Sequence, residues 1–447
     1  MQGGLSAETL ASFRTSFESH PTARMMLNAV TMNPITDVAI QRDIITSTDH
    51  TFSHRLDAWS VTNQKRSGRC WLFAGLNLLR VGAMRAMNLE DFEFSQNYLL
   101  FWDKLERANY FLETIAATAD RPLDDCTVAW LLDRPLDDGG QWNMFVNIVR
   151  KHGLVPKAVM PETNSSSNTG QMNALLLTKL RRAASTIRRL AEQGKNDQIE
   201  SEKIEIMADV FRMLSIHLGT PPAEFDWQWN DKDKVFHRDG AMTPRQFADK
   251  YVTIPLDEYV CLVNDTRETS PVGRTYTVDC LGNVVGGEIV KYLNVDADTM
   301  KRIAMKTIMA GEPVWMGCDV GKMMKRDLGI WDAELFDYER VYSTSLDMSK
   351  ADRLDYHDTL MTHAMLFTGV DVVDSPHGEV PRRWRVENSW GDADGKKGFY
   401  VMNDSWFSEY MFEIAARRSA LPKELQDALD QEPIVLPAWD PMGALAY

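Results

Sequence analysis

The sequence predicts an α+β fold of two lobes, one helical and one built of short antiparallel strands. After residue 70, apolar side chains recur at the three- and four-residue spacing of helices. From about residue 259, short β-rich runs are bounded by Gly, Pro and Asp. Between the two parts, paired amphipathic stripes predict an inserted helical hairpin. With 447 residues, the chain is long enough for the cores of two to three domains.

The amino-terminal part is predicted to be an arm followed by the helical lobe. Residues 5–20 have the pattern of a short helix, and the segment after them is predicted to be extended. One helix follows Cys70, and a second begins after Ser95, a favourable N-cap residue. The inward face of the first helix carries Phe73, Leu76, Leu79, Ala83 and Met87. We therefore assign 1–60 to the helix and arm and 61–160 to the helical lobe.

Residues 161–258 are predicted to form a helical insertion. Two amphipathic stripes flank a polar break at 193–197, which predicts an antiparallel pair of helices. The stripes carry Leu176, Leu180, Ala183, Ile187 and Leu190, then Met207, Phe211, Leu214 and Leu218. Gly219 ends the second helix, and Thr243-Pro244 opens a further one with an N-cap residue and an N1 proline. Because catalysis does not require a projecting helical pair, we expect it to contact other subunits.

Residues 259–436 are predicted to form the β-rich lobe. Its short runs indicate a small antiparallel barrel, and they are Tyr259–Val263, Thr275–Val278, Val314–Gly317, Met365–Val373, Trp384–Asn388 and Phe399–Met402. After Leu436-Pro437 the chain is too rich in Pro and Gly to be a helix. We therefore assign 437–447 to a carboxyl-terminal arm.

The stretch from Gln64 to Trp71 points to covalent catalysis. It reads Gln-Lys-Arg-Ser-Gly-Arg-Cys-Trp, so Gln64 lies six positions (70 minus 64) before Cys70. At a helix amino terminus, Cys70 would lie at the positive end of the macrodipole, which favours a thiolate. Arg66 and Arg69 add positive charge nearby. Because a glutamine amide at this distance can donate to an oxyanion, these groups are suited to acyl transfer from a thiolate.

Two partners for the thiol lie far along the chain. His363 begins an apolar, strand-like run, and Asn388 ends another in Arg-Val-Glu-Asn-Ser-Trp-Gly. The imidazole would take the thiol proton and return it to the leaving amine, while the amide oxygen would hold the other ring N–H. Trp390, two positions on, is expected to shield this bond from water and to border the substrate. Since His363 and Asn388 fall on the β lobe and Cys70 on the helical lobe, the site is expected in the cleft between them.

These residues resemble the papain superfamily. There the nucleophile lies in Cys-Gly-Ser-Cys-Trp, with His and Asn about 130–150 residues downstream. Ser67 replaces the first cysteine, so the usual disulfide is not expected, which suits a reducing compartment. The distance from Cys70 to His363 is 293 residues (363 minus 70), so roughly 150 are inserted. An enlarged papain-like enzyme without secretory cysteines is similar to the bleomycin hydrolase/aminopeptidase C family, and further matching stretches lie at 139–142, 313–322 and 439–446.

The resemblance implies a papain-like two-lobe fold with a helical hook insertion and a carboxyl-terminal arm in the cleft. It implies that Gly139 and Gly140 line the cleft, and that the carboxylate following Ala446, here on Tyr447, holds the free α-ammonium of a peptide. A cleft blocked in this way would release single amino-terminal residues with broad specificity. The resemblance also implies bleomycin-hydrolase-like amide hydrolysis and a homohexamer formed through the helical insertion.

Composition and charge exclude several other classes. The formal net charge of −15 disfavours nucleic-acid binding, which needs a basic surface. No apolar run approaches the length of a membrane span, and the first residues lack the pattern of an export signal, so a cytoplasmic enzyme without a membrane partner is expected. The five cysteines are scattered without a Cys-x-x-Cys motif, and neither a metal nor another cofactor is expected.

Three alternatives stay open at this point. A papain-like endopeptidase or oligopeptidase would result if the arm does not block the cleft. A transglutaminase-like Cys/His enzyme would normally use an Asp as its third residue, and Asn388-Ser-Trp-Gly disfavours it. A non-enzymatic scaffold would be indicated by loss of a catalytic residue, but Gln64, Cys70, His363 and Asn388 are all present.

Overall fold

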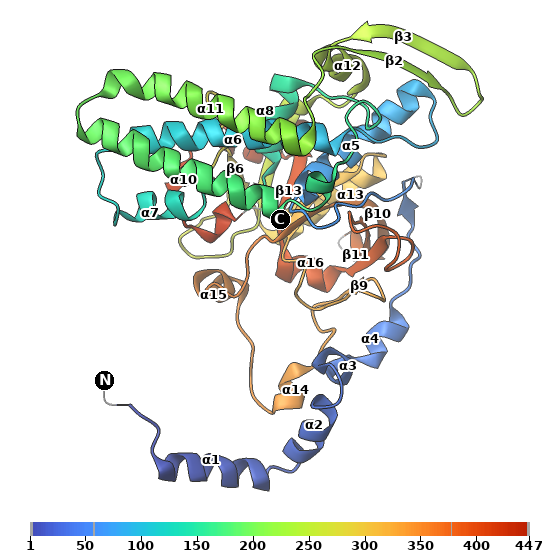
Figure 1. Cartoon of the computed structure of the whole chain (residues 1–447). Coiled ribbons are helices and arrows are strands. Elements are labelled where there is room, and N and C mark those ends of the chain that lie inside the picture. Colours follow the sequence, from blue (N-terminus) through green and yellow to red (C-terminus); the bar gives the residue numbers. More distant parts are fainter. Residues whose placement is uncertain (1–2, 57–58, 377, 445–447) are drawn as a thin grey trace.

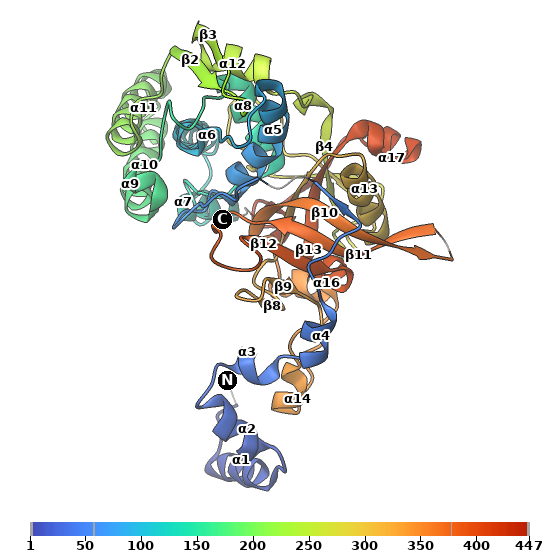
Figure 2. The same cartoon turned by 90° about the vertical axis from the view of Figure 1, so that its right-hand side faces the viewer.

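The computed structural model is an α+β molecule in which a helical lobe adjoins a lobe built on one large sheet (Figure 1). It describes residues 3–56, 59–376 and 378–444. Figure 2 shows the helical lobe above the sheet and the amino-terminal helices extending away from both. The predicted α+β class is therefore confirmed.

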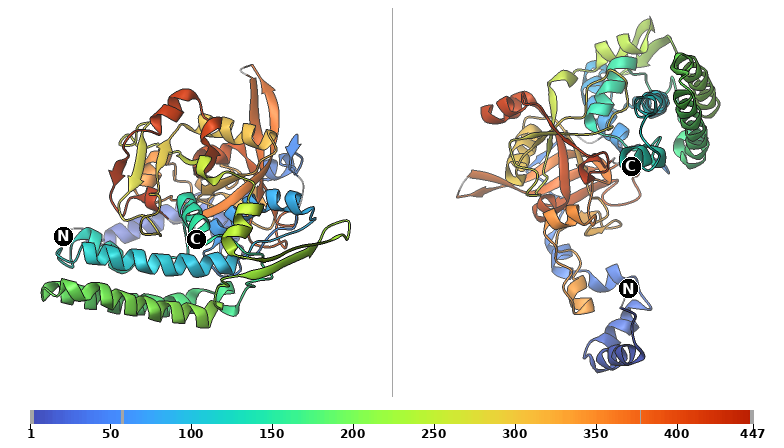
Figure 3. Two further views of the ribbon diagram at one scale, coloured as in Figure 1. Left: turned by 90° about the horizontal axis from the view of Figure 1, so that it is seen from above. Right: turned by 90° about the vertical axis from the view of Figure 1, so that its left-hand side faces the viewer.

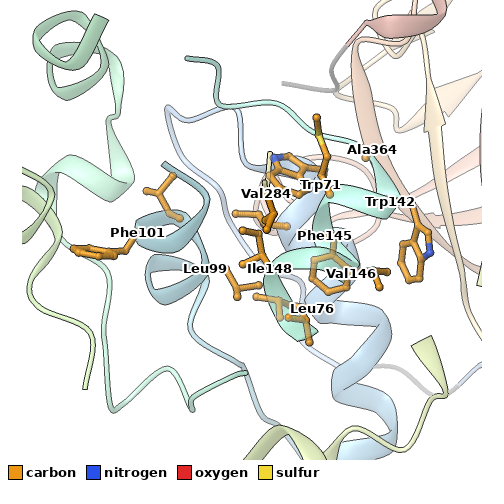
Figure 4. Packing of buried hydrophobic residues seen from close by; sticks show 14 of the residues in the cluster. Trp71, Leu76, Leu99, Phe101, Trp142, Phe145, Val146, Ile148, Val284 and Ala364 are labelled. Atoms are coloured by element: carbon orange, nitrogen blue, oxygen red, sulfur yellow. The ribbon is translucent and has the colours of Figure 1, made fainter. Parts of the chain in front are cut away.

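The helical lobe is organised around α5 (Cys70–Met87), which is buried along most of its length. It packs against α6 (Gln96–Ala117) and α8 (Trp142–His152) on one side and the sheet on the other. Figure 4 shows side chains of α5, α6 and α8 meeting in this core, among them Leu76, Leu99, Phe145 and Ile148. Ser95 caps α6, its hydroxyl accepting a hydrogen bond from the Tyr98 N–H at 3.0 Å. The remaining helix of this lobe is α7 (Cys126–Asp133).

The amino-terminal segment is helical rather than extended after its first helix. Its helices are α1 (Ala7–Ser19), α2 (Ala23–Val30), α3 (Ile35–Ala39) and α4 (Arg42–Ser47). The predicted extended arm is therefore wrong for the residues of α2, α3 and α4. The physical reason is that the apolar residues of α2 line one face that contacts α1 and α14, a distant partner that the sequence pattern does not reveal.

The insertion contains the predicted pair of helices. These are α10 (Gly170–Glu192) and α11 (Asn196–Leu218), which run antiparallel and lie against α6 (Figure 1). In the left view of Figure 3 the green insertion lies alongside α6. Smaller elements around the pair are α9 (Asn164–Ser167), β2 (Phe225–Asn230), β3 (Phe236–Met242), α12 (Pro244–Tyr251) and η1 (Leu256–Glu258). Thr243 and Gln246 form the capping box that opens α12. The β2–β3 hairpin is an element that the sequence interpretation missed.

The second lobe is a twelve-stranded sheet with the order β14-β5-β6-β4-β13-β7-β10-β11-β12-β9-β8, and β1 (His54–Arg55) pairs with β10 beside this path. The central strands are β7 (Val314–Cys318), β10 (His363–Ser375), β11 (Gly378–Glu387), β12 (Phe399–Asn403) and β13 (Met411–Arg417). The outer strands are β4 (Tyr259–Val263), β5 (Thr275–Val278), β6 (Tyr292–Asn294), β8 (Met324–Lys325), β9 (Ile330–Trp331) and β14 (Ile434–Leu436).

Short helices surround the sheet. They are α13 (Ala297–Met309), α14 (Tyr338–Tyr342), α15 (Lys350–Asp355), α16 (Asp404–Tyr410), η2 (Arg418–Ala420), α17 (Lys423–Ala428) and η3 (Pro441–Gly443). Among the described residues, none of the helices is both long and apolar enough to cross a bilayer. All five cysteines are free.

The predicted antiparallel barrel is wrong for three strand pairs. β4 with β6, β5 with β14 and β9 with β12 are parallel. Parallel neighbours need a long connection that returns the chain to the same end of the sheet, and a pattern of short strands does not show where such a connection leads. The pattern also missed β6 and β13, although β13 lies centrally between β4 and β7. The sheet is therefore mixed.

Candidate active site

Cys70 is the first residue of α5 and is completely buried. Its Sγ accepts a hydrogen bond from the Ala364 N–H of β10 at 3.4 Å. The neighbouring Trp71 donates its indole N–H to the Asp138 carbonyl at 2.7 Å, and its own carbonyl accepts from the Trp315 indole at 3.3 Å. These bonds fix the start of α5 against the sheet, so the thiol lies where the two lobes meet.

His363 begins β10, and Asn388 directly follows β11. The imidazole Nε2 lies 2.9 Å from the Asn388 amide oxygen, which also accepts from the Ser389 N–H at 2.7 Å. Because this oxygen can only accept, the bond requires that Nε2 carry the proton. In the neutral ring, Nδ1 is then left as the acceptor for a thiol proton.

An aromatic cover lies over the imidazole. The Trp390 ring packs against His363 with centroids 4.9 Å apart, and the Arg326 guanidinium lies 4.6 Å from the Trp390 ring centre. His363 and Asn388 are both buried. The bond between them is therefore kept from water, which strengthens it.

The Gln64 side chain bridges the nucleophile loop and the Asn388 loop. Its Oε1 accepts from the Ser389 hydroxyl at 2.5 Å, and its Nε2 donates to the Ser67 carbonyl at 2.6 Å. The Gln64 N–H also donates to the Ser389 carbonyl at 2.8 Å. The amide is thereby held with its nitrogen toward the loop that leads to Cys70. The structure thus brings Gln64, Cys70, His363 and Asn388 into one connected set.

Electrostatics in the site favour a neutral thiol and imidazole. Burial raises the pKa of the Cys70 thiol to about 12, although backbone N–H groups of Ala364, Trp71 and Cys70 itself oppose this rise. Burial likewise lowers the pKa of His363 to about 4, and the hydrogen bond to Asn388 opposes that fall. The positive charge expected from Arg69 is neutralised, because its guanidinium makes a two-bond pair with Glu162 at 2.9 and 2.8 Å.

Asp138 is a structural residue of the site that the sequence interpretation did not identify. It accepts from the Gly68 N–H at 3.1 Å and from Asn173 at 2.7 Å, and it pairs with the Lys104 ammonium at 2.5 Å. Burial opposes its ionisation, but the Lys104 charge and these hydrogen bonds hold the pKa of Asp138 well below its usual range. Asp138 therefore anchors the loop before Cys70. Its partners are scattered along the chain, so no local pattern could have identified it.

The other predicted substrate-binding residues lie beside the carboxyl-terminal segment. The Gly139 carbonyl accepts from Arg107 at 2.5 Å, and an added Cβ at Gly140 would lie 2.5 Å from the Trp71 ring. The next residue, Gln141, donates from Nε2 to the Ala444 carbonyl at 2.6 Å. Ala446 and Tyr447 lie outside the described residues.

The last described residues are held by specific contacts. Asp440 pairs with the Arg267 guanidinium at 3.1 and 2.9 Å, and the Met442 carbonyl accepts from the Tyr292 hydroxyl at 3.1 Å. The backbone after β14 therefore runs along the lobes to the Gln141 side chain, which directly follows Gly139 and Gly140 in the sequence.

The site combines a buried thiol at a helix amino terminus, bonded to the backbone N–H next to His363, with an imidazole that is held by an asparagine oxygen. This combination defines a papain-like cysteine peptidase. Comparison with known proteins narrows this class. The Peptidase C1-like family model matches residues 4–443, and the chain belongs to that family.

Relatives match over nearly their whole length. Bleomycin hydrolase of Gallus gallus is 43% identical over 451 residues, with 99% of each chain covered. Aminopeptidase C of Listeria monocytogenes is 42% identical over 454 residues, with both chains covered completely. The crystal structure of pepw from Lactobacillus rhamnosis HN001 superposes with a TM-score of 0.97 at 44% identity, again over the full length of both chains. The resemblance predicted from the sequence is confirmed, and the protein is a cysteine peptidase of this type.

Proposed function

We propose that the protein is a cytosolic cysteine aminopeptidase that removes single residues from peptides with a free amino terminus. The observation that carries the proposal is the contact of Gln141 with Ala444, which brings the carboxyl-terminal arm next to Gly139 and Gly140. The five free thiols suit a reducing compartment. The names of the relatives favour the same activity and extend it to amides of the bleomycin type.

The chemistry would proceed through a thioester. The Cys70 sulfur attacks the carbonyl carbon of the first residue while His363 Nδ1 accepts the thiol proton. The developing oxyanion is stabilised by the backbone N–H of Cys70 and by the second N–H of the Gln64 amide. His363 then donates its proton to the departing amine, and a water molecule, deprotonated by the same imidazole, hydrolyses the thioester.

Asn388 and Trp390 would act on the imidazole rather than on the substrate bond. The Asn388 oxygen keeps the proton on Nε2, so that Nδ1 faces the thiol in the accepting form. Since burial favours the neutral pair, we propose that the thiol is deprotonated as the substrate carbonyl is attacked, when the oxyanion donors can balance the new charge. Trp390 would border the leaving part of the peptide.

The arm accounts for exopeptidase action. A carboxylate at the end of the chain, on Tyr447 or on Ala446 after trimming, would pair with the α-ammonium of the substrate. At about 4 Å and an effective dielectric constant near 20, such a pair has a gross Coulomb energy of about 4 kcal/mol, from which desolvation subtracts. The arm would also occupy the space that longer peptides need on that side of the scissile bond. An endopeptidase is the alternative if the arm leaves the cleft open.

We also propose that the chain assembles as a homohexamer and that the α10–α11 insertion takes part. Its side chains Ile204 and Ile216 are 63% and 76% exposed, which favours a covering partner. Light scattering of the full chain and of Ile204→Glu/Ile216→Glu would test this. Loss of the hexamer in the variant is expected, and a wild-type monomer would contradict the proposal.

The test of the activity compares a fluorogenic aminoacyl amide with its N-acetylated form, with Cys70→Ala as the blank. Cleavage of the free-amine form alone is expected. Equal cleavage of both forms would indicate an endopeptidase, and cleavage by the Cys70→Ala variant would contradict the assignment of the nucleophile.

A further inference from the structure

A cavity of about 640 Å³ lies between the segment around Trp59 and strands β11 and β12. It borders the active-site loop, because its lining includes Gly391 and also Asn63, which forms a β-bridge with Trp390. The charged residues in its described lining are Arg55, Arg385, Lys396, Lys397 and Asp392. The described lining therefore holds four cations and one carboxylate, although the whole chain has a net charge of −15. A local excess of positive charge of this kind attracts anions.

Arg385 supplies a buried cation to this cavity. Its side chain is 4% exposed, its NH1 donates to the Thr368 hydroxyl at 2.8 Å, and its guanidinium lies 3.6 Å from the Phe399 ring centre. Within the described part of the chain, no carboxylate forms an ion pair with it. Burial and the charge of Arg55 lower the pKa of Arg385 to about 10, and the charge of Glu387 opposes this fall.

The nearest carboxylate of the same strand is already engaged. Glu387 accepts from the Trp59 indole at 2.6 Å, from Asn77 at 2.9 Å and from Arg80 at 2.7 Å. These three hydrogen bonds hold the Glu387 carboxylate on Trp59, Asn77 and Arg80, so it acts on Arg385 by its charge and not through a hydrogen bond that the described residues show. A buried guanidinium that makes no ion pair is costly, so an anionic ligand would complement it.

Other carboxylates near the cavity are also paired elsewhere. Asp49 lies 2.8 Å from Arg383, and Asp394 lies 2.6 Å from Arg326. Arg55, Lys396 and Lys397 are exposed and form no ion pair among the residues that the structure describes. His50, also in the lining, has its pKa lowered by burial and then by the charge of Lys396. Among the described residues, ion pairs therefore do not neutralise the charges of Arg55, Lys396 and Lys397.

We propose that this cavity binds a phosphate group, with Arg385 as the buried anchor and Arg55, Lys396 and Lys397 at the exposed rim. The planar guanidinium fork matches two oxygens of a phosphate, and lysines add charge without fixed geometry. The volume lies within the range of small-molecule sites, and Phe52, Trp59 and Tyr400 offer aromatic surface beside the cations. The phosphate is either inorganic phosphate or the phosphoryl group of a small organic molecule.

Calorimetric titration of the full chain with inorganic phosphate and with phenyl phosphate, at constant ionic strength in a phosphate-free buffer, tests the proposal. Saturable binding of one phosphate per chain is expected. Tighter binding of phenyl phosphate would identify an organic phosphate as the ligand, and equal binding would identify inorganic phosphate; both support the site. Absence of saturable binding with either compound, or binding of succinate but not phosphate, would overturn it.

The matched variants separate this site from a general salt effect. Arg55→Glu/Lys397→Glu reverses two exposed charges at the rim, and the affinity for phosphate should fall about tenfold or more. Lys306→Glu changes the charge of an exposed residue of α13 that lies outside the cavity lining, and the affinity should stay as in the wild type. Equal affinity in the rim variant and the wild type would contradict the proposal, even if Arg385→Ala fails to fold.

Discussion

The Gln64 side chain makes two hydrogen bonds, one at each end of its amide. Its Oε1 accepts from Ser389, which ties the nucleophile loop to the loop of Asn388, whereas its Nε2 is turned toward the Ser67–Cys70 segment. The first contact joins the two loops, and in the proposed mechanism the second orients the amide nitrogen toward the oxyanion. Single substitutions can therefore distinguish the positioning contact from the catalytic one.

We expect Gln64→Ala to lower kcat by about 10²–10³-fold, because one oxyanion donor is lost. Ser389→Ala is the matched control, since it removes the bond to Oε1 and keeps the amide. Its kcat should fall much less. Steady-state kinetics on the aminoacyl amide measures both, and a loss in Ser389→Ala as large as that in Gln64→Ala would show that Gln64 acts mainly by joining the loops.

The buried imidazole makes stability depend on pH. Burial lowers the pKa of His363 from 6.5 to about 4, so between these values the unfolded chain binds more protons than the folded one. The free energy of unfolding should therefore fall as the pH drops from about 6.5 to about 4, by about 3 kcal/mol from this residue. Denaturant unfolding of His363→Gln should show a shallower decline than the wild type. The exposed His357 provides the control, and His357→Asn should follow the wild-type curve.

At the scale of elements, Gly140 lies so close to Trp71 of α5 that a larger side chain does not fit at this position. A Cβ there would lie 2.5 Å from the Trp71 ring, which is buried next to Cys70. Gly140→Ala should lower the free energy of unfolding by about 1–3 kcal/mol, as overpacking does, and reduce activity by displacing Trp71. Gly170→Ala should be neutral or stabilising, because nothing lies within 4 Å of its added Cβ in α10. Thermal unfolding of both variants measures the contrast.

The elements that the sequence predicted well are those whose signal is local. The N-cap Ser95, the stripes of α10 and α11, and the contexts of Cys70 and His363 are each contained in a short stretch. The parallel strand pairs and the anchor Asp138 depend on partners far away in the sequence, such as Lys104 and Asn173. Helices α2 and α3 were missed for the same reason, because they contact α14, which lies far away in the sequence.

At the scale of the whole molecule, Glu387 joins three parts of the chain. It accepts from Trp59 of the amino-terminal segment and from Asn77 and Arg80 of α5, while it belongs to β11 of the sheet. Burial raises the pKa of Glu387, and the Arg80 charge opposes that rise. The two lobes are thus connected by a buried charge pair, which is stable only while both members are present.

Glu387→Ala should lower the free energy of unfolding by about 3–5 kcal/mol, because Arg80 is left buried without its carboxylate. The double variant Arg80→Met/Glu387→Leu should recover much of this loss, since it removes both charges and keeps apolar volume. Chemical denaturation of the three proteins measures the effect. Equal stability of the single and double variants would mean that the lost hydrogen bonds, not the unpaired charge, determine the cost.

In the proposed function, the carboxyl-terminal arm limits the cleft to substrates with a free amino terminus. Asp440 binds Arg267 and also caps η3, accepting from the Met442 N–H at 2.9 Å, so it fixes the arm before it reaches Gln141. Loss of charged hydrogen bonds of this kind weakens a contact by about 1.5–3 kcal/mol, so Asp440→Ala should raise the ratio of N-acetylated to free-amine cleavage by about tenfold or more. Asp430→Ala removes a pair with Arg418 on the exposed surface and should leave the ratio unchanged. An unchanged ratio in Asp440→Ala would mean either that the arm is held by its other contacts or that it does not limit access to the cleft. The same assay on a chain that ends at Ala444 would distinguish these two explanations.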